Sequence, residues 1–167
     1  MTSQSKADHK NDEIERLENS RQYLIVYLAG QTFGLPVLQV QDVLGSHKVT
    51  HIPLAPPQVE GSLNLRGRIV TAINVRRCLG LEENQKKEDC MSVVVEHRQE
   101  LFSLVIDKVG DVLSLHDDEF EPTPPKLDKM WRDISTGIYR LDDSLLIILD
   151  VPKLLQTINT RKDAALA

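Results

Sequence analysis

An all-β protein with two small barrels is the fold class that the sequence predicts, and three observations favour it. Hydrophobic residues make up 41% of the 167-residue chain, which is enough for a substantial core. They fall in short runs rich in β-branched residues and bounded by Gly, Pro and Asn, which is typical of strands. The pattern then occurs a second time along the chain, which indicates two related units.

The first unit opens with a predicted hairpin. Tyr23–Leu28 is a run of aliphatic and aromatic residues that ends at the turn signal Ala29-Gly30. Thr32–Pro36 follows with apolar and other residues in alternation, as expected for the second strand. Pro36 cannot donate a hydrogen bond to a neighbouring strand, so the strand ends or lies at a sheet edge there.

The middle of the first unit is less regular. We expect a bend with one helical turn at Leu38–Val43 and a further strand at Lys48–Pro53. Pro56 and Pro57 mark an irregular crossing, because proline interrupts both helices and strands.

A second hairpin and a short helix end the first unit. The strand that contains Leu65 reverses at Gly67 and continues into the strand Arg68–Val75. Asn74 is the predicted N-cap of the short helix, and Gly80 is its predicted end.

The second unit follows from an internal repeat. A shift of 69 residues places Phe33–Leu44 on Phe102–Leu113, and beyond Pro122 a shift of 76 residues places Gly61 on Gly137. The positions of the first stretch that are identical in the second are Phe33, Leu35, Val40, Asp42, Val43 and Leu44. Each half is therefore one unit of about five strands and a short helix, and closure of each unit into a barrel would remove exposed sheet edges.

The repeat also sets the expected domain organisation. Residues 1–21 are a polar leader, and residues 22–157 form a single domain followed by a tail at residues 158–167. The first lobe covers about residues 22–85 and the second about residues 90–157, with a charged linker between them. Exchange of strands between the two lobes is left open.

The sequence contains no catalytic motif: there is no glycine-rich phosphate loop, nucleophile elbow or zinc-protease signature. His47 and His51 share one face of a predicted strand, but a metal site needs a third ligand. Cys78 and Cys90 match no zinc spacing and are too few for a disulfide framework. We therefore expect no enzyme, no cofactor, no metal and reduced thiols.

Composition argues against two further classes of function. The chain has 25 Asp and Glu against 20 Lys and Arg, a formal net charge of −5 and only 4% aromatic residues, which disfavours nucleic-acid binding. The first residues lack the apolar run of a secretory signal, and no stretch has the length of a membrane helix. We expect a cytoplasmic protein without direct membrane insertion.

Four arginines that are close in sequence form a candidate anion site, because arginine binds carboxylates and phosphates with paired hydrogen bonds. They are Arg66, Arg68, Arg76 and Arg77. Arg76 and Arg77 would more simply lie on the outer face of their helix. Arg66 precedes Gly67 at the hairpin turn, and a partner contact and a structural ion pair are equally favoured for it.

Two non-enzymatic classes of function remain. A groove between two stiff lobes would suit an apolar helix of a partner, which favours a binding module. A small-molecule-sensing β-barrel is the alternative, and a metabolite that strongly raised the melting temperature would favour it.

The sequence from Gln22 to about Thr157 resembles the CheW family of bacterial chemotaxis adaptors. The first lobe carries FGLPVLQVQDVL at Phe33–Leu44 and EGSLNLRGRIVTAINVR at Glu60–Arg76, with the specific NLRG core. The second lobe carries VIDKVGDVLSL and LLIILDVPKLL.

The resemblance implies a fold of two intertwined five-stranded SH3-like barrels with short helices, and a non-catalytic role as a scaffold in chemotaxis signal transduction. The implied partners are the regulatory domain of a CheA-type histidine kinase and the cytoplasmic hairpin tip of methyl-accepting chemoreceptors, which docks between the barrels. The chain would then be recruited to membrane receptor arrays. The same adaptor role in a non-flagellar chemosensory pathway is a second possibility.

The resemblance also implies a set of partner-binding residues. Arg66 matches the NLRG arginine that the family uses for receptor coupling, and Asn64 and Gly67 complete the motif as its structural support. Val40 and Asp42 match the bend that is implicated in partner binding. Asp42 stands where glutamate is frequent in the family, so its carboxylate has a shorter reach.

Overall fold

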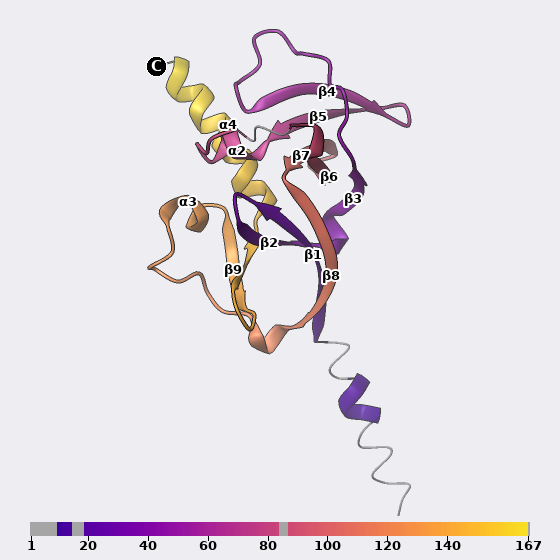
Figure 1. The fold of residues 1–167 in the computed structure, drawn as a ribbon, viewed down its shortest axis with the longest axis vertical. Coiled ribbons are helices and arrows are strands. Elements are labelled where there is room, and N and C mark those ends of the chain that lie inside the picture. Colours follow the sequence, from indigo (N-terminus) through magenta and orange to yellow (C-terminus); the bar gives the residue numbers. More distant parts are fainter. Residues whose placement is uncertain (1–9, 15–18, 84–86, 167) are drawn as a thin grey trace, which may run out of the picture.

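The computed structural model describes residues 10–14, 19–83 and 87–166. Ten strands in these ranges form two five-stranded sheets, which lie one above the other in Figure 1. The strands are β1 (Ser20–Leu28), β2 (Gln31–Pro36), β3 (Val40–Leu44), β4 (Val59–Leu65), β5 (Arg68–Asn74), β6 (Met91–His97), β7 (Glu100–Ile106), β8 (Lys108–His116), β9 (Ser135–Arg140) and β10 (Leu145–Leu149). The helices labelled in Figure 1 are α2 (Val75–Cys78), α3 (Lys129–Arg132) and α4 (Val151–Leu166).

Each sheet takes strands from both halves of the chain. The order β8-β1-β2-β10-β9 forms the lower unit in Figure 1, called barrel A here, and β3-β6-β7-β5-β4 forms the upper unit, barrel B. Exchanging every strand for its counterpart in the repeat (β1 for β6, β2 for β7, and so on) turns one order into the other. The intertwined arrangement is therefore confirmed, and the two halves do not close on themselves in tandem.

The strand pairing reproduces the internal repeat residue by residue. Val26 lies opposite Phe33 in barrel A, and Val95 lies opposite Phe102 in barrel B, as the shift of 69 residues requires. The parallel pair of β2 with β10 in barrel A corresponds in the same way to the parallel pair of β7 with β5 in barrel B. The two sheets therefore share the same strand order and the same pairing register.

Each barrel closes through a backbone bridge between its two edges. The segment that follows β3 meets β4 in barrel B, and the segment that follows β8 meets β9 in barrel A. In barrel B the backbone groups of Thr50 and Ser62 exchange two hydrogen bonds of 2.8 Å. Gly61 permits this approach, because a Cβ atom there would lie 2.3 Å from the Thr50 carbonyl oxygen. Barrel A repeats the arrangement, since a Cβ atom at Gly137 would lie 2.7 Å from the Glu121 carbonyl oxygen.

Two predictions for the first unit need correction. A 3-10 turn at Val37–Gln39 is present, but the bend predicted at Leu38–Val43 ends there, because β3 begins at Val40. The strand predicted at Lys48–Pro53 is wrong. This segment forms only a single bridge, at Thr50. Prolines on its C-terminal side limit the ladder, because they lack the N–H group that a ladder needs.

The short helix after the second hairpin is confirmed in detail. The Asn74 side chain accepts a hydrogen bond of 3.1 Å from the Arg77 backbone N–H, as an N-cap does. Gly80 follows with a φ of 70°, the left-handed conformation that ends many helices. Cys78 points inward from this helix and is buried.

A shared core lies between the barrels. It joins one face of each sheet, opposite to the barrel interior, to α2 and to the first turns of α4, so each barrel depends on the other for part of its burial. Each barrel also has a smaller interior core of its own.

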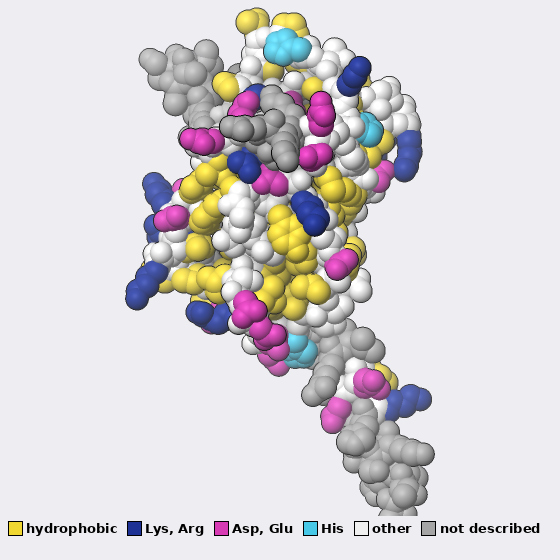
Figure 2. Space-filling model, in the orientation of Figure 1, with side chains coloured by type: hydrophobic (Ala, Val, Ile, Leu, Met, Phe, Trp, Pro, Cys, Tyr) yellow, Lys and Arg dark blue, Asp and Glu magenta, His cyan; other side chains and the backbone are white. Residues whose placement is uncertain are grey.

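The surface combines charges of both signs. On the face drawn in Figure 2, acidic and basic side chains are interspersed, and hydrophobic side chains gather mainly over barrel A. Within the described residues, no helix combines the length and the apolar character that crossing a bilayer requires.

Candidate partner-binding site

The fold brings Asp42 and Arg66 together from opposite ends of a sheet. Asp42 lies on β3 and Arg66 directly follows β4, and these are the first and last strands in the order of barrel B. Closure of the barrel places the Arg66 Nη2 atom 3.1 Å from the Asp42 Oδ2 atom. The two residues are 24 positions apart in sequence, and the sequence alone does not predict their contact.

The turn holds the backbone of Arg66 rigidly. Arg66 and Gly67 both have positive φ values, 53° and 84°, which is the pattern of a two-residue hairpin turn matched to strand twist. The Asn64 side chain accepts a hydrogen bond of 2.8 Å from the Gly67 backbone N–H. Asn64 and Gly67 therefore support the turn, and the Arg66 side chain remains 81% exposed.

Asp42 is the anchored member of the ion pair. Its Oδ1 atom accepts a hydrogen bond of 2.8 Å from the Val43 backbone N–H, and its side chain is only 24% exposed. The contact of Oδ2 with Arg66 lacks hydrogen-bond geometry, and Oδ2 has no hydrogen-bond donor among the described residues. The guanidinium of Arg66 thus keeps directed donors for a partner.

Two residues of barrel B that are close in sequence to this ion pair have exposed apolar side chains. Val43 is exposed beside Asp42 on β3, and Ile69 on β5 is exposed directly opposite Asn64. Val40, in contrast, lies beside a β-bulge and packs against the shared core, so its side chain is only partly accessible.

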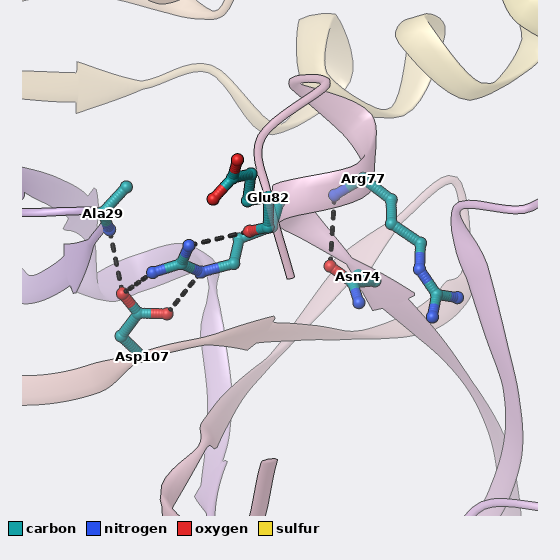
Figure 3. A network of polar contacts seen from close by, with 6 residues as sticks. Ala29, Asn74, Arg77, Glu82 and Asp107 are labelled. Atoms are coloured by element: carbon teal, nitrogen blue, oxygen red, sulfur yellow. Dashed lines mark hydrogen bonds and ion pairs between the residues drawn. The ribbon is translucent and has the colours of Figure 1, made fainter. Parts of the chain in front are cut away.

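A polar contact between the two barrels was not predicted from the sequence. The Arg76 guanidinium donates hydrogen bonds of 2.9 and 2.6 Å to the two carboxylate oxygens of Asp107, and it also donates to the Glu82 carbonyl. Asp107 accepts a further hydrogen bond of 2.9 Å from the backbone N–H of Ala29, in the β1–β2 turn of barrel A (Figure 3). The hydrogen bond to Asp107 raises the pKa of Arg76.

Arg76 therefore does not lie on the outer face of its helix as expected. The repeat offers a signal that could have revealed its role. Arg76 stands where the second unit has Pro152, and Asp107 stands where the first unit has Leu38. Both residues of this ion pair are charged, whereas their counterparts in the repeat are uncharged. This difference indicates that the contact between Arg76 and Asp107 has no equivalent at the counterpart positions.

His47 and His51 belong to no group of three or more possible metal ligands among the described residues. The His47 Nδ1 atom lies 3.1 Å from the carbonyl oxygens of Gly45 and Ser46. No group of three or more His, Cys, Asp or Glu side chains within the described ranges could hold a metal ion.

Comparisons with known proteins cover most of the chain. A family model described as a CheW-like domain matches residues 22–159. The chain is 31% identical over 137 residues to the chemotaxis protein CheW of Klebsiella aerogenes, with 82% of each chain covered. It is 25% identical over 153 residues to the probable chemotaxis protein CheW of Rhizobium etli, with 91% of this chain and 97% of that one covered.

A solved structure is similar in fold. The crystal structure of scaffolding protein TtCheW from Thermoanaerobacter tengcongensis matches with a TM-score of 0.70 and 28% sequence identity. The match covers 78% of this chain and 89% of that one, and so includes most of both barrels.

Proposed function

Because this chain belongs to the CheW family of non-catalytic chemotaxis scaffolds, we propose that it couples transmembrane chemoreceptors to a CheA-type histidine kinase. The observation that carries this proposal is the family match over residues 22–159, which spans both barrels. An adaptor needs at least two partner surfaces held at a fixed geometry, and two barrels with a shared core provide such a body.

The surface around Arg66 supports one of the two contacts. The candidate partner-binding residues are Val40, Asp42, Asn64, Arg66 and Gly67. We infer that Arg66 donates to a carboxylate or carbonyl of the partner, while Asn64 and Gly67 hold the turn and Asp42 orients the guanidinium. Val43 follows Asp42 and Ile69 pairs with Asn64, and both are exposed apolar residues of the same barrel.

A groove beside α4 is the proposed binding site for a helical partner. An open pocket of about 630 Å³ lies between barrel B and α4, with Val59, Ile73, Phe102 and Leu155 among the apolar side chains that line it. The apolar face of a receptor helix fits a groove of this composition. The regulatory domain of the kinase would then contact a different face, and the chain would be cytoplasmic and recruited to receptor arrays.

The proposal is tested by reconstitution. Membranes that contain a chemoreceptor are mixed with the kinase, with and without this chain, and the kinase that sediments with the membranes is measured. The chain should raise the sedimented kinase and its receptor-dependent autophosphorylation. If neither changes, and a pull-down with the chain as bait brings down no kinase, the adaptor function is wrong.

The same adaptor role in a non-flagellar chemosensory pathway stays open beside this proposal. The kinase captured in the pull-down discriminates the two, because the genes next to that kinase encode the output of its pathway.

A further inference from the structure

The two barrels have different interiors, and the repeat allows a position-by-position comparison. In barrel A an open pocket of about 530 Å³ is lined in part by Tyr23, Tyr139 and Ile148, and large side chains pack together in the interior core. Tyr23 and Tyr139 meet there with their hydroxyl oxygens 3.3 Å apart, and burial together with this hydrogen bond raises the pKa of Tyr139. The other side chains of this interior are Ile25, Leu113, Leu115, Leu141, Leu146 and Ile148.

Barrel B has large apolar side chains at only some of the corresponding positions. Val94, Leu44, Leu63, Leu65 and Val70 take the places of Ile25, Leu113, Tyr139, Leu141 and Leu146, and they pack together in the same way. Three large side chains of barrel A, however, have small counterparts. Ser92 stands for Tyr23, Ala72 for Ile148 and Ser46 for Leu115.

These three replacements coincide with a cavity. A space of about 170 Å³ lies in barrel B, and Ser46, Ala72 and Ser92 all line it. Ala72, Ser92 and the neighbouring Ser103 are buried, whereas Gly45, Ser46 and His47 are exposed at the mouth. The exposed mouth gives a ligand from solvent access to this space. A cavity of about 150 Å³ accommodates benzene, and this one is similar in size.

The charges around the cavity favour a positive occupant. Arg76 and Asp107 both line the space, but they pair with each other. Glu83 is paired with Arg77. Glu60 is different, since the hydrogen bond of 2.8 Å from the Asn74 amide to its Oε1 atom is its one polar side-chain contact among the described residues. Among the described residues, no cation pairs with the Glu60 carboxylate.

We propose that this cavity is a binding site for a small organic cation of roughly benzylamine size. Its ammonium group is bound by Glu60, with Ser92 and Ser103 lining the buried end, and its apolar body packs against Ala72, Leu63 and Val105. The site is additional to the adaptor function, and its own experiment tests it independently of receptor and kinase.

Benzylamine is a suitable probe, with benzyl alcohol and benzoate as neutral and anionic analogues of nearly the same shape. The full chain, labelled with ¹⁵N, is titrated with each compound while the backbone amide signals of Ser92 and Ser103 are followed, and calorimetry gives the dissociation constants. Benzylamine should cause saturable shifts at these amides and bind about tenfold more tightly than benzyl alcohol, as expected for one charge-assisted hydrogen bond. Benzoate should not bind.

Two variants assign the binding to the cavity. Ala72→Ile restores the residue of barrel A, fills the space and should abolish binding of benzylamine. Glu60→Gln keeps an acceptor for Asn74 but removes the charge, and it should reduce the affinity for benzylamine about tenfold while leaving benzyl alcohol unaffected. Glu96→Gln, on an exposed position of β6, is the matched control and should change neither.

The proposal is overturned by any of three results: no saturable shift, equal affinity for the amine and the alcohol, or binding that survives Ala72→Ile. Glu60 is only partly buried at the edge of the barrel, so its variant tests the cation preference even if the Ala72 variant fails to fold. A Glu60→Gln protein that binds benzylamine like the wild type also overturns the assignment.

Discussion

Arg66 illustrates how a residue can be ion-paired and still remain available to a partner. The sequence favours a partner contact and a structural ion pair equally, and the structure shows an ion pair with Asp42 that leaves the Arg66 side chain 81% exposed. Exposed ion pairs contribute about 0–1 kcal/mol to stability. The pair therefore orients the guanidinium more than it stabilises the fold.

Arg66→Ala should separate partner binding from stability. We expect the free energy of unfolding to fall by less than about 1 kcal/mol, and receptor-dependent kinase activation to weaken by roughly tenfold or more. Arg68→Ala removes an exposed arginine from the other side of the same turn, and it should leave both quantities near wild type. An Arg66→Ala protein that unfolds, or that couples normally, would assign Arg66 a purely structural role.

Asp107 is the residue whose loss should affect stability. Asp107→Asn weakens the two hydrogen bonds to the half-buried Arg76 and leaves its charge uncompensated, which should lower the free energy of unfolding by about 2 kcal/mol. Urea denaturation measures this change. Asp111→Asn, an exposed aspartate on β8, should alter stability by less than about 0.5 kcal/mol. Equal effects of the two substitutions would show that the contact with Arg76 contributes nothing.

At the level of elements, the sequence predicts strands and local turns well because these depend on neighbouring residues. The hairpin turn at Gly67 and the helix cap at Asn74 are both confirmed. The ends of β3 were less predictable, because the bulge next to Val40 arises from pairing with β6, a strand about 50 residues away. Similarly, Arg66 and Asp42 meet only through closure of the barrel, which no local pattern encodes.

The glycines at the closure points can be tested individually. Gly61→Ala places a Cβ atom 2.3 Å from the Thr50 carbonyl oxygen, so the bridge must shift, and we expect a loss of about 2 kcal/mol or more. Gly45→Ala meets no atom within 4 Å and is the matched control, with a change of less than about 1 kcal/mol. Thermal unfolding compares the two, and similar melting temperatures would contradict a tight closure at Gly61.

At the level of the whole molecule, the halves defined by the repeat are not the units that fold. A cut after Glu83 separates β1–β5 from β6–β10, and neither fragment then contains all strands of either sheet. Each fragment alone should be largely unfolded by circular dichroism and NMR, and an equimolar mixture should regain the spectrum of the intact chain. A well-dispersed NMR spectrum from residues 1–83 alone would contradict this expectation.

The exchange of strands also sets an order of events during synthesis. The strands of barrel B, β3 to β7, are consecutive in the chain, whereas barrel A combines β1 and β2 with β8, β9 and β10. As the chain leaves the ribosome from its N-terminus, barrel B has all its strands once Ile106 has emerged. The β1–β2 hairpin must wait until Leu149 for its last partner strand. The first strands to be made are therefore among the last to become fully paired, and the nascent chain carries an unprotected apolar hairpin through most of its synthesis.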